Sequence, residues 1–114
     1  MPRQDLRTAQ DAPAAPKMSE RQLRDAIVLC ARTLGYKAHW TWRSDHSPAG
    51  WPDLVLTRGN RLIFAELKVG KRKPTPAQLE WLAALSAVPG VETFVWYDAH
   101  WLNGDVEAVL REAE

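Results

Sequence analysis

Three charged residues lie among apolar neighbours in a segment that reads as two β-strands. Asp53 begins the first apolar run, and Glu66 and Lys68 lie in the second. Two carboxylates held close together in a partly covered sheet repel each other unless a cation lies between them. Oxygen ligands suit a hard divalent ion such as Mg²⁺ or Mn²⁺. A lysine beside such an ion can orient a water and stabilise charge on an attacked phosphate, so these residue types indicate metal-assisted hydrolysis.

The distance between these side chains depends on how the two runs pair. Gly59-Asn60 lies between them and is a dipeptide suited to a two-residue hairpin turn. With that loop, Asp53 lies directly opposite Glu66 on the same face, with the two Cβ atoms about 5 Å apart. Lys68 is two residues further along the strand and shares that face. A three-residue loop would break this register and separate the acids.

Two further groups could complete the site. The backbone carbonyl of Leu67 lies between the acid and the lysine, and Glu20 could add a carboxylate if its helix packs over the same face. The structural alternative is that Asp53 ends a strand at the surface, Glu66 and Lys68 form a solvated pair, and Glu20 favours the helix dipole. Against that alternative stand three apolar residues on the same face, which should be buried: Val55, Leu62 and Phe64.

The elements around these residues follow the order αβββαβα. Two capping-box patterns, Ser19 with Gln22 and Thr75 with Gln78, predict helix starts. The predicted helices cover residues 19–34, 75–88 and 105–113, and the predicted strands cover 37–43, 53–58, 61–69 and 91–97. The hairpin strands are apolar on both faces, so both faces need cover. A helix joins the last two strands, which makes them parallel. We therefore predict an α/β fold, a small mixed sheet flanked by helices.

Length and composition indicate one domain. The chain has 114 residues, and the Ala- and Pro-rich stretch 1–18 is predicted to be a flexible tail before a domain at 19–114. A single cysteine, Cys30, excludes an internal disulfide. No apolar run approaches the roughly 18 residues of a membrane-spanning helix. We expect a cytoplasmic protein, without membrane contact, from a bacterial or phage-infected cell. The net charge of +1 means that any DNA-binding surface is local.

Pro52-Asp53 followed by Glu66-Leu67-Lys68 resembles the signature of PD-(D/E)xK nucleases, whose restriction-endonuclease-like core has the same element order. Further matches make the sequence resemble the virus-type replication-repair nuclease (VRR-NUC) domain. They are Glu20, the run Gly50-Trp51-Pro52-Asp53-Leu54 and the helix start Thr75-Pro76-Ala77-Gln78. The resemblance covers about residue 19 to the C-terminus.

The resemblance implies a role for each matched position. Asp53 and Glu66 would bind the metal together with the Leu67 carbonyl, and Lys68 would position the nucleophilic water. Glu20 would bind metal directly or through water, and Gln78 would lie at the edge of the site. The implied activity is Mg²⁺-dependent hydrolysis of DNA phosphodiester bonds, with Mn²⁺ able to substitute. The implied protein is a homodimer selective for branched DNA, like a Holliday junction resolvase. The alternatives are a nuclease for linear DNA, a DNA-binding module that does not cut, and a purely structural interaction domain.

Several other residues have open roles. Gln78 is also a competent capping residue, and the two roles do not exclude each other. Trp51 and Trp101 could stack on unpaired bases or pack in a dimer interface. Basic and polar residues near the predicted site could contact phosphates. These candidates are Lys71, Arg72, Lys73, Arg43 and Ser44. Lys71, Arg72 and Lys73 could alternatively form a solvated turn, but a neighbouring metal site that must hold a polyanion favours contact with phosphates.

Overall fold

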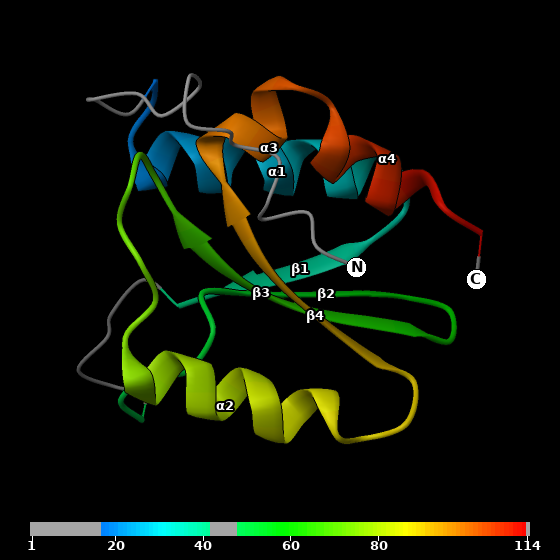
Figure 1. Cartoon of the computed structure of the whole chain (residues 1–114). Coiled ribbons are helices and arrows are strands. Elements are labelled where there is room, and N and C mark those ends of the chain that lie inside the picture. Colours follow the sequence, from blue (N-terminus) through cyan, green and yellow to red (C-terminus); the bar gives the residue numbers. More distant parts are fainter. Residues whose placement is uncertain (1–16, 42–47, 114) are drawn as a thin grey trace.

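A four-stranded mixed sheet forms the middle layer of the molecule (Figure 1). The computed structural model describes residues 17–41 and 48–113. The strands lie in the order in which they occur along the chain, β1 (Lys37–Trp40), β2 (Leu54–Arg58), β3 (Arg61–Lys68) and β4 (Val91–Tyr97). β1, β2 and β3 are antiparallel neighbours, and β3 and β4 are parallel as predicted.

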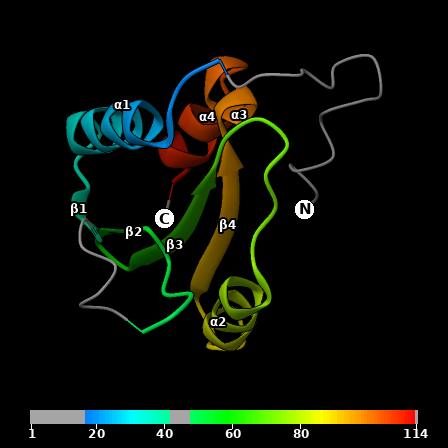
Figure 2. The same cartoon turned by 90° about the vertical axis from the view of Figure 1, so that its left-hand side faces the viewer.

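Helices cover both faces of the sheet, which its two apolar faces require. On one face lies α2 (Pro76–Ser86), and on the other lie three helices, α1 (Glu20–Thr33), α3 (Asp98–Leu102) and α4 (Asp105–Arg111). Figure 2 shows this arrangement. Both predicted capping boxes are present, at the starts of α1 and α2. Among the described residues, no helix is long and apolar enough to cross a membrane.

The hairpin has the predicted register. Arg58 pairs with Arg61 across the Gly59-Asn60 turn, and the pairing continues to Leu54 and Ala65. Gly59 has a φ of +59°, a conformation that glycine adopts without steric cost. Asp53 directly precedes the last pair on β2, and Glu66 directly follows it on β3. The turn chemistry therefore brings the two acids to the same end of the sheet.

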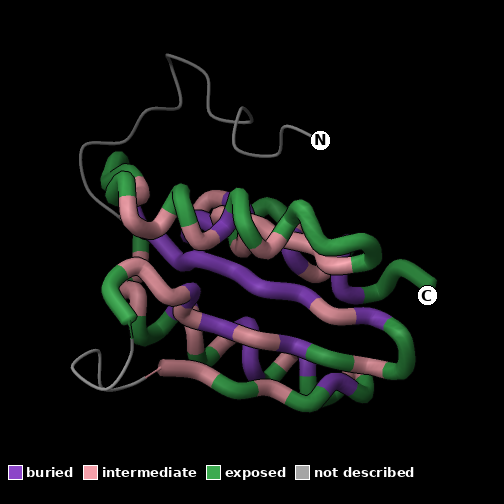
Figure 3. The backbone as a smooth tube through the Cα atoms, turned by 90° about the horizontal axis from the view of Figure 1, so that it is seen from below, coloured by how far each residue is buried: buried purple, intermediate pink, exposed green. Residues whose placement is uncertain are grey.

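The alternation of side chains along the hairpin separates two environments. One set of residues is fully buried against the three-helix face, and it comprises Leu54, Leu56, Ile63 and Ala65. The alternate residues, Phe64 and Glu66 among them, face α2. The run of buried residues from 63 to 70 forms the centre of the molecule in Figure 3. Helix α1 therefore covers the face opposite Glu66, and Glu20 lies near the acids at the start of α1, not on a helix packed over their face.

Two parts of the structure differ from the sequence-based expectation. Helix α3 was not predicted, because it follows β4 without a linker and is only five residues long, too short for a periodic pattern. The ring nitrogen Nδ1 of His100 accepts a hydrogen bond from the N–H of Tyr97 (3.0 Å), the residue that precedes α3. This contact gives the N–H at the start of α3 a hydrogen-bond partner. The first strand is shorter than predicted: β1 ends at Trp40, whereas the predicted strand covered residues 37–43. Its predicted residues 42 and 43, like the predicted tail up to residue 16, lie outside the described residues.

Candidate active site

Asp53 joins the beginning of β2 to the end of β3. Its Oδ2 accepts a hydrogen bond from the backbone N–H of Leu67 (2.9 Å), and its carbonyl accepts one from the N–H of Thr41 (3.1 Å). In a strand, the N–H and C=O of one residue point toward the same neighbouring strand. The carbonyl of Leu67 therefore faces the side on which Asp53 lies. The register would place Pro52 across from Leu67, and proline has no N–H to donate to that carbonyl.

Glu66 is a carboxylate in the interior, with only 1% of its surface exposed. Its Oε2 accepts a hydrogen bond from Nε2 of Gln78 (2.6 Å) and lies 3.7 Å from Nζ of Lys68. Its Oε1 is buried and has no hydrogen-bond partner among the described residues. Buried carboxylate oxygens are normally satisfied, so this oxygen is an exception that needs a physical explanation.

The electrostatics of Glu66 reflect this incomplete environment. Burial, followed by the negative charge of nearby Asp53 and the hydrogen bond that a protonated Glu66 makes with Asp53, raises the pKa of the Glu66 carboxyl to about 8, and Glu20 adds to the rise. Lys68 lowers the pKa of Glu66 but does not offset the other contributions. A cation beside the two acids would favour the charged form of Glu66. The site therefore has the charge distribution of a place that can accept a positive ion.

Gln78 serves the helix and the site with one side chain. Its Oε1 accepts a hydrogen bond from the N–H of Thr75 (2.8 Å), which completes the capping box of α2. Its Nε2 donates to Glu66 at the same time. The two roles that the sequence left open therefore coexist.

The loop before Asp53 holds the start of α2 against the sheet. Gly50 has a φ of +84°, and a Cβ at this position would lie 2.5 Å from the backbone carbonyl of Ala77. The neighbouring Trp51 packs edge-to-face against Phe64 and Trp81, with ring centroids 5.7 and 4.9 Å apart. A glycine at position 50 thus lets the loop approach the helix closely enough for Gln78 to reach Glu66.

Glu20 lies near the two acids without joining them. Its Oε2 is 3.8 Å from Nη1 of Arg72, and its side chain is partly exposed at the start of α1. The described residues contain no group of three His, Cys, Asp or Glu side chains close enough to hold one metal ion. In this structure the candidate metal ligands are therefore Asp53, Glu66 and the Leu67 carbonyl, with Glu20 in the surroundings.

The predicted DNA-contacting residues divide into two groups. Lys71, Arg72 and Lys73 are exposed in the loop that follows β3. The hydroxyl of Tyr97 donates a hydrogen bond to the carbonyl of Arg72 (2.7 Å) and so anchors this loop beside the site. Arg43 and Ser44 lie outside the described residues.

Asp98 is a buried residue that the sequence reasoning missed. Its carboxylate accepts hydrogen bonds from the N–H of Gly70 (3.1 Å) and from the N–H of Lys17 (2.8 Å). It therefore ties the segment after Lys68 to the segment before Glu20. The available signal was its place directly after β4, whose parallel neighbour β3 ends at Lys68.

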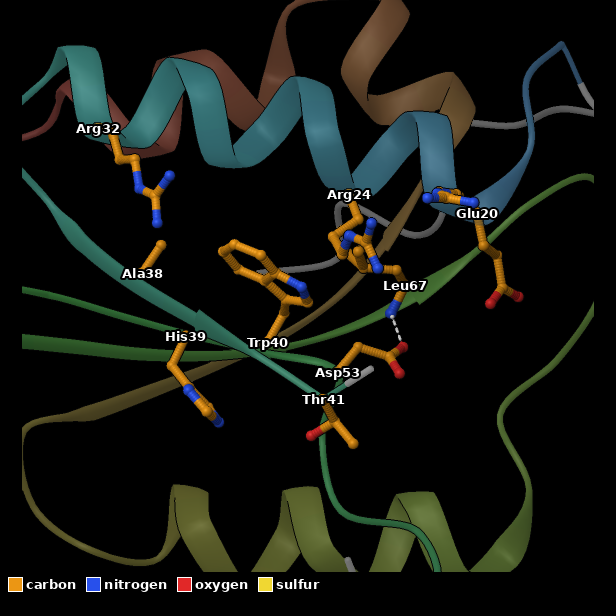
Figure 4. A pocket seen from close by; sticks show the side chains of 10 residues that line it. Glu20, Arg24, Arg32, Ala38, His39, Trp40, Thr41, Asp53 and Leu67 are labelled. Carbon is orange, nitrogen blue, oxygen red and sulfur yellow. Dashed lines mark hydrogen bonds between the residues drawn. The ribbon is translucent and has the colours of Figure 1, made fainter. Parts of the chain in front are cut away.

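A cavity of about 900 Å³ opens beside Asp53, between α1 and β1 (Figure 4). Asp53 and Leu67 line one end, and Glu20 projects beside them from the start of α1. Other lining residues were not singled out from the sequence, namely Arg21, Arg24, Arg32, His39 and Trp40. The signal for the arginines was their recurrence on one helix, next to its apolar stripe.

Comparison with known proteins supports the fold. No family model matches the sequence, and no curated protein matches it. A solved structure that matches is that of Hjc from Archaeoglobus fulgidus, described as a Holliday junction resolvase from an archaeal hyperthermophile, with a TM-score of 0.52 and 25% sequence identity. The match covers 68% of this chain and 64% of the resolvase chain, so the chain spans less than two thirds of it. The predicted α/β fold with a restriction-endonuclease-like core is confirmed, with α3 as an additional helix.

Proposed function

We propose that this protein is a metal-dependent DNA endonuclease that hydrolyses phosphodiester bonds and prefers branched DNA. The observation that carries the proposal is the buried Glu66, whose Oε1 has no hydrogen-bond partner in the described part of the chain and which lies beside a second acid and a lysine. Buried carboxylate oxygens are normally hydrogen-bonded, and an unsatisfied one beside a second acid favours a place for a cation. The resemblance to VRR-NUC nucleases supports the same reading and points to these same residues.

The residues present fit a divalent cation. Asp53, Glu66 and the Leu67 carbonyl would hold it, because all three are oxygen donors of the kind that Mg²⁺ prefers and Mn²⁺ accepts. When bound, the ion would supply Lewis-acid activation of the phosphate and lower the pKa of a coordinated water. Glu20 would act through a water.

The other side chains perform the remaining tasks. Lys68 would orient the attacking water and stabilise negative charge on the phosphate, since its ammonium group lies on the same side as the acids. Gln78 would fix the orientation of Glu66 through its amide hydrogen bond. Exposed Lys71, Arg72 and Lys73 would contact the DNA backbone beside the site.

The preference for branched DNA and the homodimer rest on likeness. The matching solved structure is that of a Holliday junction resolvase, and the VRR-NUC resemblance implies the same class of substrate. A dimer would place two sites on one junction, which a symmetric pair of cuts requires.

The test compares a labelled four-way DNA junction with a linear duplex of the same sequence, each in Mg²⁺, Mn²⁺ and EDTA. We expect junction cutting that requires metal and that falls by roughly 100-fold or more in Lys68→Ala. Lys37→Ala is the matched control, because it removes an exposed lysine at the far end of β1 and should cut like the wild type.

The other outcomes discriminate among the alternatives. Equal cutting of both DNAs would retain the chemistry and contradict the preference for branches. DNA binding without cutting in any metal would indicate a binding module. Neither binding nor cutting would indicate an interaction domain and contradict the proposal as a whole.

A further inference from the structure

Two arginines of α1 are held against one tryptophan of the edge strand β1. The guanidinium carbons of Arg24 and Arg32 lie 5.5 and 5.3 Å from the centre of the Trp40 ring. Figure 4 shows both side chains reaching down from α1 toward Trp40. Arginines stacked on a ring in this way lose freedom before any ligand binds, so less is lost when the ligand arrives.

The position of this cluster relative to the candidate site is fixed by the sheet. Trp40 pairs with Leu54, the residue that follows Asp53. The residue directly after β1, Thr41, donates its N–H to the carbonyl of Asp53. Arg24, Arg32 and Trp40 line the same cavity as Asp53 and Leu67. A ligand that enters this cavity therefore meets the arginines and Asp53 as parts of one surface.

The charges around the cavity favour an anion. Three arginines line it, whereas its carboxylates are Glu20 and Asp53, both at one end. Arg24 donates from Nε and Nη2 to Asp25, which lies outside the cavity, and this contact fixes the direction of its guanidinium. If the arginines only covered the half-buried ring of Trp40, one would suffice, and the second would add repulsion between like charges.

The spacing of the arginines matches a nucleic-acid strand. Arg24 and Arg32 are eight residues apart on α1, about 12 Å along the helix axis, but their side chains converge on the Trp40 ring. The two guanidinium carbons are therefore no more than about 11 Å apart, and successive phosphates of one DNA strand advance by about 3.4 Å along the duplex, so the pair spans at most about three nucleotide steps. The arginines are thus placed for phosphates that follow the one at the acids along the same strand.

We propose that Arg24 and Arg32, held by Trp40, bind backbone phosphates of the DNA strand that leads to Asp53 and Glu66. This inference rests on the proposed function, because it takes the ligand to be the DNA on which the site acts. It adds a phosphate-binding track on α1 that is separate from the basic loop after β3.

The test is the salt dependence of binding to a labelled linear duplex in EDTA, where no cutting interferes. For the double variant Arg24→Gln/Arg32→Gln, we expect the slope of log K against log salt to decrease by about 1.8, which corresponds to roughly 60-fold weaker binding at 0.1 M salt. Arg24→Lys/Arg32→Lys keeps the charges and should retain most of the slope. Arg111→Gln is the control, because it removes an exposed arginine of α4 that pairs with Glu107.

An unchanged slope in the glutamine variant would overturn the inference, as would an equal loss in Arg111→Gln, which would reveal only a net-charge effect. A lysine variant that binds as weakly as the glutamine variant would also overturn it. Cutting is measured separately in Mg²⁺. Wild-type protein that binds with the expected slope but never cuts would overturn the proposed nuclease and support the track. Wild-type protein that binds no DNA would overturn both.

Discussion

Each end of β3 buries a charged side chain, but among the described residues only one of the two side chains has a full set of hydrogen-bond partners. Arg61 begins the strand and Glu66 lies near its other end, and both are almost fully buried. Arg61 donates two hydrogen bonds to Glu92 (2.7 and 2.9 Å), one to the hydroxyl of Tyr36 (2.8 Å) and one to the carbonyl of Val109 (2.7 Å).

The Glu66 end lacks this completeness. Among residues 17–41 and 48–113, one Glu66 oxygen has no hydrogen-bond partner, the ammonium group of Lys68 is 3.7 Å from the other oxygen, and a second acid lies close by. A buried charge with all its partners in place costs the fold little, whereas a buried charge without them is destabilising. The comparison teaches that burial alone does not mark a functional charge. What distinguishes Glu66 is the part of its environment that the protein does not supply.

Arg61→Ala removes the buried, fully hydrogen-bonded charge at the start of β3 and should have the largest effect on the free energy of unfolding. It removes one hydrogen bond each from the Tyr36 hydroxyl and the Val109 carbonyl, and it removes the ion pair with the Glu92 carboxylate. We expect a loss of about 3–5 kcal/mol in the free energy of unfolding, measured with urea. Arg111→Ala, at an exposed pair on α4, should lose less than about 0.5 kcal/mol. A loss below about 1 kcal/mol for Arg61→Ala would contradict the contrast between the two ends.

Glu66, at the other end of β3, should make the free energy of unfolding depend on pH. The raised pKa of Glu66 means that the folded protein keeps a proton that the unfolded chain releases above its ordinary pKa of 4.5. Raising the pH from about 4.5 to 8 in EDTA therefore favours unfolding, by at most about 1.4 kcal/mol per pH unit and roughly 2–4 kcal/mol in all. Glu66→Gln should flatten this dependence, whereas Glu107→Gln, at an exposed acid of α4, should not. A wild type whose stability is flat over this range would show that Glu66 is better solvated than the structure indicates.

A divalent metal ion should provide the missing positive charge beside Glu66 and so stabilise the fold. We expect this effect on stability to be smaller than those of Arg61→Ala and of pH. At ten times its dissociation constant, Mg²⁺ or Mn²⁺ should stabilise the wild type by about 1.4 kcal/mol and raise the melting temperature by several degrees. Asp53→Asn should lose this shift, and Asp25→Asn, at an exposed acid of α1, should retain it. Equal shifts in both variants would mean that the ion binds elsewhere.

Local chemistry made much of the fold predictable. The Gly59-Asn60 turn predicted the register that brings Asp53 and Glu66 to one end, and each capping box predicted a helix start. These features depend on residues a few positions apart. The pairing of the acids followed from the same register, together with the apolar residues around them.

Features that depend on packing between distant elements could not be predicted in the same way. The face covered by α1 decides the place of Glu20, and two faces that are both apolar give no preference. The contacts of Trp40 with Arg24 and Arg32 exist only because α1 crosses over β1. Asp98 binds Gly70 and Lys17, which are far from it in the sequence.

The amide of Gln78 explains a choice between two similar residues. A capping box accepts glutamine or glutamate equally, since only a side-chain oxygen is needed to receive the N–H of Thr75. A glutamate would serve the helix, yet its second oxygen would confront Glu66 and add a third negative charge. An amide carries an acceptor on one side and a donor on the other. The Gln78 oxygen accepts the N–H of Thr75, so the amide nitrogen points toward Glu66. The capping box of α2 therefore determines that Gln78 presents a hydrogen-bond donor to the acid.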